Sequence, residues 1–149
     1  MASAISGILA TAAPFERAFA QHGWGDGWRN GIYPFLHFHT ATHEVLGIAR
    51  GRATVEFGGA KGRALSVAAG DVVVLPAGTG HRRLSASGDL LVVGAYPCNA
   101  SFDQQRPGQV DHNKAVAAIA KVPLPEMDPV HGRDGPLMQM WKGERFQLN

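Results

Sequence analysis

Short runs of alternating apolar and polar residues, rich in β-branched and aromatic side chains, recur through the middle of the chain. Each run is typical of a strand, and glycine-containing turns separate the runs. The seven predicted strands cover residues 33–40, 44–50, 53–57, 64–67, 71–75, 81–85 and 90–96. Seven short strands at this spacing indicate an all-β sandwich or barrel.

Glycine marks the connections between these runs. Hairpins are predicted at residues 58–62, 70–71 and 87–89, because glycine accepts the positive φ that tight turns require. The segment 23–31 combines four glycines with Trp24 and Trp28, and it is predicted to be a loop whose indoles pack onto a larger body.

Two short helices are predicted, one on each side of the strand-rich region. Pro14 suits the first turn of a helix that continues through Phe19 and ends at Gly23. Residues 98–110 are predicted to form a polar loop, after which Asp111 caps a helix that ends before Pro123. Residues 137–141 are compatible with an edge strand or with simple packing on the barrel.

Composition narrows the class of protein. The 149 residues suffice for one domain, predicted as an N-terminal helix and loop (1–30), a barrel core (31–97) and a C-terminal loop, helix and tail (98–149). The formal charge of +2 comes without a basic stripe, so no nucleic-acid partner is expected. No apolar run is long enough for a membrane span, and Cys98 is the single cysteine, so we expect a cytoplasmic protein without a membrane partner.

A group of histidines points to chemistry. His37 and His39 are two residues apart in a predicted strand, so they share a face with Tyr33 and Phe35. Two imidazoles on such an apolar face are costly unless each finds a partner, and a transition metal would provide one. A hairpin with the following strand would bring Glu44 close to them. Such a set, with a third nitrogen ligand, suits Fe(II), Mn(II), Ni(II) or Zn(II).

The spacing of these residues resembles the two motifs of the cupins. The first motif is Gly31, five residues, His37, one residue, His39, four residues, Glu44, six residues and Gly51. The second is Gly70, five residues, Pro76, one residue, Gly78, two residues and His81, with Ser85 where the cupin pattern has asparagine. Residues 28–33, 43–51 and 93–97 are further similar to the YjlB-type cupins.

The resemblance implies a single jelly-roll barrel, also called a double-stranded β-helix, with one divalent metal bound by His37, His39, Glu44 and His81. It also implies a homodimer. Gly47 and Ala49 would allow close approach by either a partner subunit or the C-terminal helix. The implied function is that of a metal-dependent enzyme of the dioxygenase, isomerase or decarboxylase type, acting on a small oxygen-rich molecule. The alternative is a non-catalytic cupin that binds a sugar or an organic acid.

Six residues are candidates for substrate binding or proton transfer. The candidates for proton transfer are Tyr33, Tyr96 and His43, although the sequence favours a turn or surface position for His43. The candidates for the pocket wall are Tyr33, Phe35, Arg83 and Ser85. Arg83 is expected either to bind a carboxylate or phosphate or to lie in solvent, and Tyr33 and Phe35 are equally compatible with core packing.

Overall fold

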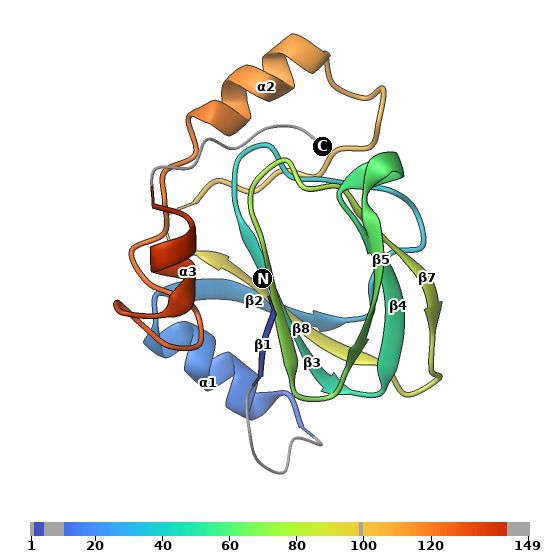
Figure 1. Ribbon diagram of the computed structural model, residues 1–149, viewed down its shortest axis with the longest axis vertical. Coiled ribbons are helices and arrows are strands. Elements are labelled where there is room, and N and C mark those ends of the chain that lie inside the picture. The colour runs from blue at the N-terminus through green and yellow to red at the C-terminus, as the bar shows by residue number, and fades with distance from the viewer. Residues whose placement is uncertain (1, 5–10, 99, 143–149) are drawn as a thin grey trace.

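The computed structural model describes residues 2–4, 11–98 and 100–142, in which the strands form two antiparallel sheets. The five-stranded sheet has the order β1 (Ala2–Ala4), β6 (Asp71–Leu75), β3 (Glu44–Arg50), β8 (Leu91–Pro97) and β2 (Trp24–Asn30). The three-stranded sheet has the order β5 (Arg63–Ala68), β4 (Arg52–Phe57) and β7 (His81–Ala86). The two sheets face each other as a jelly roll, which confirms the predicted all-β fold (Figure 1).

The helices lie outside this jelly roll (Figure 1). They are α1 (Ala13–Gln21), α2 (His112–Ala120) and α3 (Pro136–Met140), and one 3-10 turn spans Gly59–Lys61. The predicted N-cap of α2 is present, since the Asp111 carboxylate accepts a hydrogen bond from the Lys114 amide. Within the described part of the chain, no helix is long and apolar enough to cross a membrane.

Alternation along β3 divides the core into two layers. Leu46 and Ile48 face the opposite sheet and pack with Val55 of β4, which is fully buried. Val45 and Ala49 face outward, where Phe15 of α1 belongs to the same buried cluster. Glu44 shares the parity of Leu46 and Ile48, so the strand directs its carboxylate into the space between the sheets.

The outer face of β3 is covered by α1. A Cβ atom added at Gly47 would lie 2.5 Å from Cδ1 of Phe15 and 3.0 Å from Cζ of Phe19. Small side chains on β3 therefore admit this N-terminal helix. At Gly47 the close neighbour is therefore α1, which is neither of the two predicted elements, a partner subunit or the C-terminal helix.

Several predicted connections and elements differ from the structure. Only the turn at 58–62 closes a hairpin, between β4 and β5, whereas the turns at 70–71 and 87–89 carry the chain from one sheet to the other. Residues 137–141 form most of α3 and its cap rather than an edge strand, and Leu137 and Trp141 pack into the outer core. Glycine content predicts where the chain changes direction, but it does not specify which strand the next segment pairs with.

The predictions for two neighbouring segments, 23–31 and 33–40, are also wrong. Residues 33–40 form only isolated bridges, at His37 and Phe38, and Pro34 lacks the amide that a continuous ladder requires. Conversely, the glycine-rich segment predicted as a loop contains β2, which pairs with β8 through a bulge between Gly25 and Trp28. Asp26 has a φ of 51° at this bulge, which lets the strand continue past it.

Candidate metal centre

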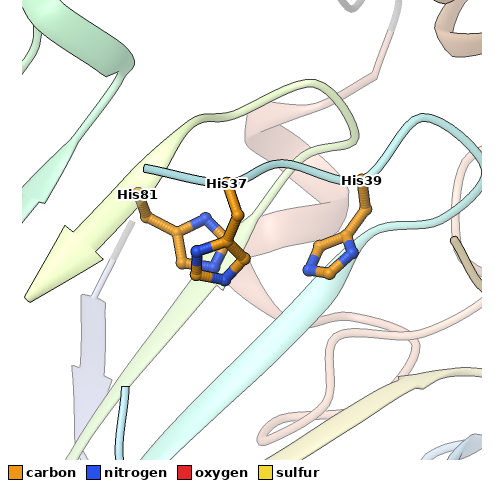
Figure 2. A group of neighbouring side chains, drawn as sticks. All are labelled: His37, His39 and His81. Atoms are coloured by element: carbon orange, nitrogen blue, oxygen red, sulfur yellow. The ribbon is translucent and has the colours of Figure 1, made fainter. Parts of the chain in front are cut away.

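The three candidate histidine ligands come from two segments that the backbone joins directly. His37 and His39 lie in the irregular segment before β3, and His81 is the first residue of β7. The amide of His37 donates to the carbonyl of His81 at 3.2 Å, and the amide of His81 donates back to the carbonyl of His37 at 2.9 Å. One potential ligand atom from each of the three buried imidazoles lies within 4.8 Å of the other two (Figure 2).

Each imidazole is oriented by a hydrogen bond from its Nδ1 to a backbone carbonyl. Nδ1 of His37 bonds to the carbonyl of Phe35 at 3.1 Å, and Nδ1 of His81 bonds to the carbonyl of Thr79 at 3.0 Å. Nδ1 of His39 bonds to the carbonyl of Asp103. A carbonyl oxygen only accepts, so each Nδ1 carries the proton and each Nε2 keeps its lone pair for another partner.

Glu44 completes this group from the start of β3. Its side chain is 4% exposed, and its Oε1 lies 3.2 Å from Nε2 of His39 and 3.3 Å from Nε2 of His81. Two imidazole lone pairs therefore face a buried carboxylate with no fixed donor between them. Such an arrangement is stable only if a cation, either a proton or a metal ion, lies among the acceptors.

The pKa values of these groups follow from their burial and from their contacts with one another. Burial alone would lower the pKa of His39, but the hydrogen bond and charge of Glu44 outweigh it and raise that pKa. Burial alone would raise the pKa of Glu44, and the bonds from His39 and His81 instead hold it well below its usual range. His37 is different, because burial and then the nearby His81 lower its pKa to about 4.

The donor set fits a divalent transition metal. Neutral imidazoles with one carboxylate are the ligands that Fe(II), Mn(II), Ni(II) and Zn(II) share, and three nitrogens with one oxygen leave further positions open in an octahedral site. The carbonyl partners of the three Nδ1 atoms supply the outer shell that metal-binding histidines usually have.

The four residues open into a cavity of about 430 Å³. Its wall is mainly aromatic and apolar, with a few polar side chains. Among the candidates for binding or proton transfer, Tyr33, Arg83 and Tyr96 line this cavity. The volume is within the range of small-molecule sites, so the group faces a space suited to an organic ligand.

Three other candidates do not line the cavity. Phe35 stacks on Tyr33 with ring centroids 4.6 Å apart, and the guanidinium of Arg106 covers it at 3.5 Å. Ser85 is exposed, because a bulge shifts the register so that Ser85 pairs with Thr54 while Arg83 pairs with Val55. Thr54 lies on the outward face of β4, so its partner Ser85 faces outward too.

His43 lies on the other side of the chain from Glu44. It is 1% exposed, so the predicted turn or surface position is wrong. Its Nδ1 accepts a hydrogen bond from the amide of Ala77, and its Nε2 donates to the carbonyl of Pro123, both at 2.9 Å. Burial lowers its pKa to about 4, so this imidazole is a neutral bridge between the barrel and the C-terminal segment.

Tyr96 lies beside the candidate metal ligands. Its hydroxyl accepts a hydrogen bond from Nε1 of Trp28 at 2.9 Å and also interacts with Glu44. Burial, followed by the charge of Glu44, raises the pKa of Tyr96. The phenol therefore stays protonated at neutral pH and is a hydrogen-bond donor rather than a base.

The loop after β8 adds residues to the site that sequence reasoning missed. Phe102 and Gln104 line the cavity, and the ring of Phe102 lies 5.6 Å from that of His39. Asp103 supplies the carbonyl for His39, while its carboxylate accepts hydrogen bonds from the amides of Thr40 and Ala41. No periodic pattern marks these residues, and the only signal was an acidic side chain in a segment predicted to be a polar loop.

Comparisons with known proteins found one similar protein sequence and several solved structures of low sequence identity. No family model matches the chain. The uncharacterized protein YjlB of Bacillus subtilis (strain 168) is 41% identical over 126 residues, which cover 85% of this chain and 76% of that protein. Acireductone dioxygenase from Bacillus anthracis is 15% identical, with a TM-score of 0.43, over 58% of this chain and 59% of that one. A variant of Bacillus subtilis oxalate decarboxylase is 21% identical, with a TM-score of 0.44, over 61% of this chain and 26% of that one.

Two facing antiparallel sheets that present His37, His39, Glu44 and His81 between them define a cupin. With 41% identity over most of its length, the chain belongs to the YjlB family of small cupins.

Proposed function

We propose that the protein is a metal-dependent enzyme acting on a small oxygen-rich organic molecule in the 430 Å³ cavity. His37, His39, Glu44 and His81 would hold one divalent ion. The observation that supports this proposal is the convergence of three buried imidazoles with a buried carboxylate, whose Oε1 lies 3.2 Å from Nε2 of His39 and 3.3 Å from Nε2 of His81. A bound ion would act as a Lewis acid on a substrate oxygen.

The surrounding side chains of this chain would supply the other parts of the reaction. The aromatic wall excludes water from the substrate. Tyr96 is positioned by Trp28 and would donate a hydrogen bond, while Tyr33 is 46% exposed and lies at a more open part of the cavity. These groups are compatible with oxygenation, isomerisation or decarboxylation, so the proposal is limited to that set of reactions.

Metal content and turnover test this proposal together. Untagged protein purified without chelators is expected to contain one divalent transition metal per chain by elemental analysis. His81→Ala should lose the metal, whereas the control His112→Ala, at an exposed position on α2, should retain it. Equal metal content in the two variants, or an untagged wild type without metal, would refute the assignment.

Turnover is measured with the loaded protein and a panel of diols, flavonols, keto acids and sugar phosphates, following substrate loss and dioxygen consumption. We expect conversion of at least one panel member by the wild type and none by His81→Ala. Tight binding of a panel member without conversion would instead support the alternative, a non-catalytic binding cupin.

The cupin resemblance also supports a homodimer in the cytoplasm as part of this proposal. Light scattering of the purified protein tests the assembly, and a monomeric mass would remove the dimer. The result would not affect the site, because the candidate ligands all come from one chain.

A further inference from the structure

Arg83 is the one cationic side chain among the described residues that line the cavity. It lies in β7, two residues after His81. Its amide donates to the carbonyl of Tyr33 at 2.9 Å, so the backbone at Arg83 is tied to the segment that carries His37. Arg83 pairs with Val55, whose side chain is fully buried between the sheets, which places Arg83 on the same face.

The guanidinium of Arg83 has no carboxylate partner among the described residues. The neighbouring Arg82 differs in this respect, because its Nε lies 2.9 Å from Oε1 of Glu56 on the outer face. Arg29 is paired with Glu16, and Arg106 lies over an aromatic ring. An arginine that is partly buried at a cavity and left without a counterion is suited to bind an anion.

Charge in the cavity favours the same type of ligand. Glu44 is the only acidic residue among the described lining residues, and a divalent ion bound there would more than neutralise it. With Arg83 included, the loaded cavity would carry a clear excess of positive charge. The remaining polar side chains of the wall, such as Asn30 and Gln104, are uncharged.

Spacing indicates the size of this anion. Two residues along a strand separate Cα atoms by about 6.6 Å, so His81 and Arg83 start from nearby points on one face and both line the cavity, within reach of one small ligand. Guanidinium matches a planar carboxylate with two parallel hydrogen bonds. Phosphate is the weaker fit, because phosphate sites usually combine several cations or a run of backbone amides, and this wall offers one cation.

We propose that the cavity binds a small carboxylic acid, with its carboxylate on Arg83 and a hydroxyl or keto oxygen directed to the metal ligands. This proposal rests on the proposed function for the metal and adds the substrate class and a residue that determines specificity. The ligand class is then that of short 2-oxo and 2-hydroxy acids.

Calorimetric binding to metal-loaded protein tests the inference. The probes are pyruvate, lactate and mandelate, their uncharged amides, and inorganic phosphate. We expect at least one of the acids to bind the wild type, and to bind at least 10-fold more tightly than its amide. Arg83→Met should weaken the binding of that acid by about 10- to 100-fold and remove the preference for the acid over its amide, since both hydrogen bonds and the charge of the guanidinium are lost.

Arg82→Met is the matched control, because it removes the adjacent guanidinium on the outer face and should leave acid binding unchanged. Equal acid binding by Arg83→Met and wild type, failure of all three acids to bind the loaded wild type, or Arg83-dependent binding of phosphate alone would each overturn the proposal. Metal content is measured in the same samples. Absence of metal from the wild type counts against the proposed function, whereas full metal content with binding that ignores Arg83 counts against this inference alone.

Discussion

Asp103 connects the loop after β8 to the candidate metal ligands, and its removal tests the site directly. Its carboxylate accepts hydrogen bonds from the amides of Thr40 and Ala41, both at 2.8 Å, and from the hydroxyl of Thr40 at 2.6 Å. Its carbonyl accepts the Nδ1 proton of His39. The same residue therefore holds the turn that follows His39 and the ring of His39 itself.

The expected magnitudes follow from these bonds. Asp103→Ala leaves two backbone amides and one hydroxyl without their acceptor, at a site that water partly reaches. We expect a loss of about 2–4 kcal/mol in the free energy of unfolding, because a hydrogen bond to a charged group contributes about 1.5–3 kcal/mol and water can take the place of the carboxylate at part of this site. For a chain of this size the melting temperature should fall by about 5–10 °C. Metal affinity should fall by about 10- to 100-fold, since the loop no longer orients His39.

Thermal unfolding of the metal-free protein and competition with a chromophoric chelator measure the two effects separately. Asp71→Ala is the control for destabilisation alone, because the Asp71 carboxylate accepts a 2.9 Å hydrogen bond from the Ala68 amide at a turn of the sheet. Asp103→Asn keeps an acceptor oxygen and should be intermediate. The reasoning fails if Asp103→Ala binds metal as tightly as Asp71→Ala does.

Two other predictions concern core packing and proton release. Gly47→Ala should destabilise the protein by about 1–3 kcal/mol in chemical unfolding, because its Cβ would lie 2.5 Å from Phe15, whereas Gly88→Ala meets nothing within 4 Å and should be nearly neutral. The raised pKa of His39 means that this imidazole keeps its second proton to a higher pH than an ordinary histidine when no metal is bound, and a metal must displace that proton. Metal affinity should therefore rise with pH, and calorimetry at pH 6.5 should give heats that depend on the ionisation enthalpy of the buffer. Buffer-independent heats would contradict a protonated His39.

Local sequence patterns predicted those elements whose conformation depends mainly on their own residues. The run 44–50 alternates in a way that matches the two cores on either side of β3, and Asp111 caps α2. The segment 33–40 has strand-like residues, but Pro34 lacks an amide and leaves only isolated bridges. The reverse holds for β2. Its glycines suggest a loop, but the segment forms a strand because it pairs with the edge of β8.

The cupin motifs are short segments whose spacing largely fixes the relative positions of their residues, so the sequence predicts that the four candidate ligands lie close together. In the structure, a β-bridge between His37 and His81 joins the two motif segments. Glu44, the first residue of β3, then lies beside His39. Strand alternation predicts that Ser85 shares the face of His81 and Arg83, and this prediction is wrong. One bulge between Arg83 and Ser85 turns Ser85 to the opposite face. No local rule in the sequence predicts that bulge.

Asp103 and Phe102 were not predictable because their role depends on a loop that returns over the site from the end of β8. The ring of Phe102 lies 5.2 Å from that of Tyr96, so the loop covers one side of the cavity. The adjacent Asp103 orients His39, whereas the carbonyl partners of His37 and His81 lie two residues away in their own segments. One of the three imidazoles thus depends on a loop contact that is distant in sequence. Covering the substrate and orienting that ligand are therefore properties of the same short loop, and a change in its position should alter both together.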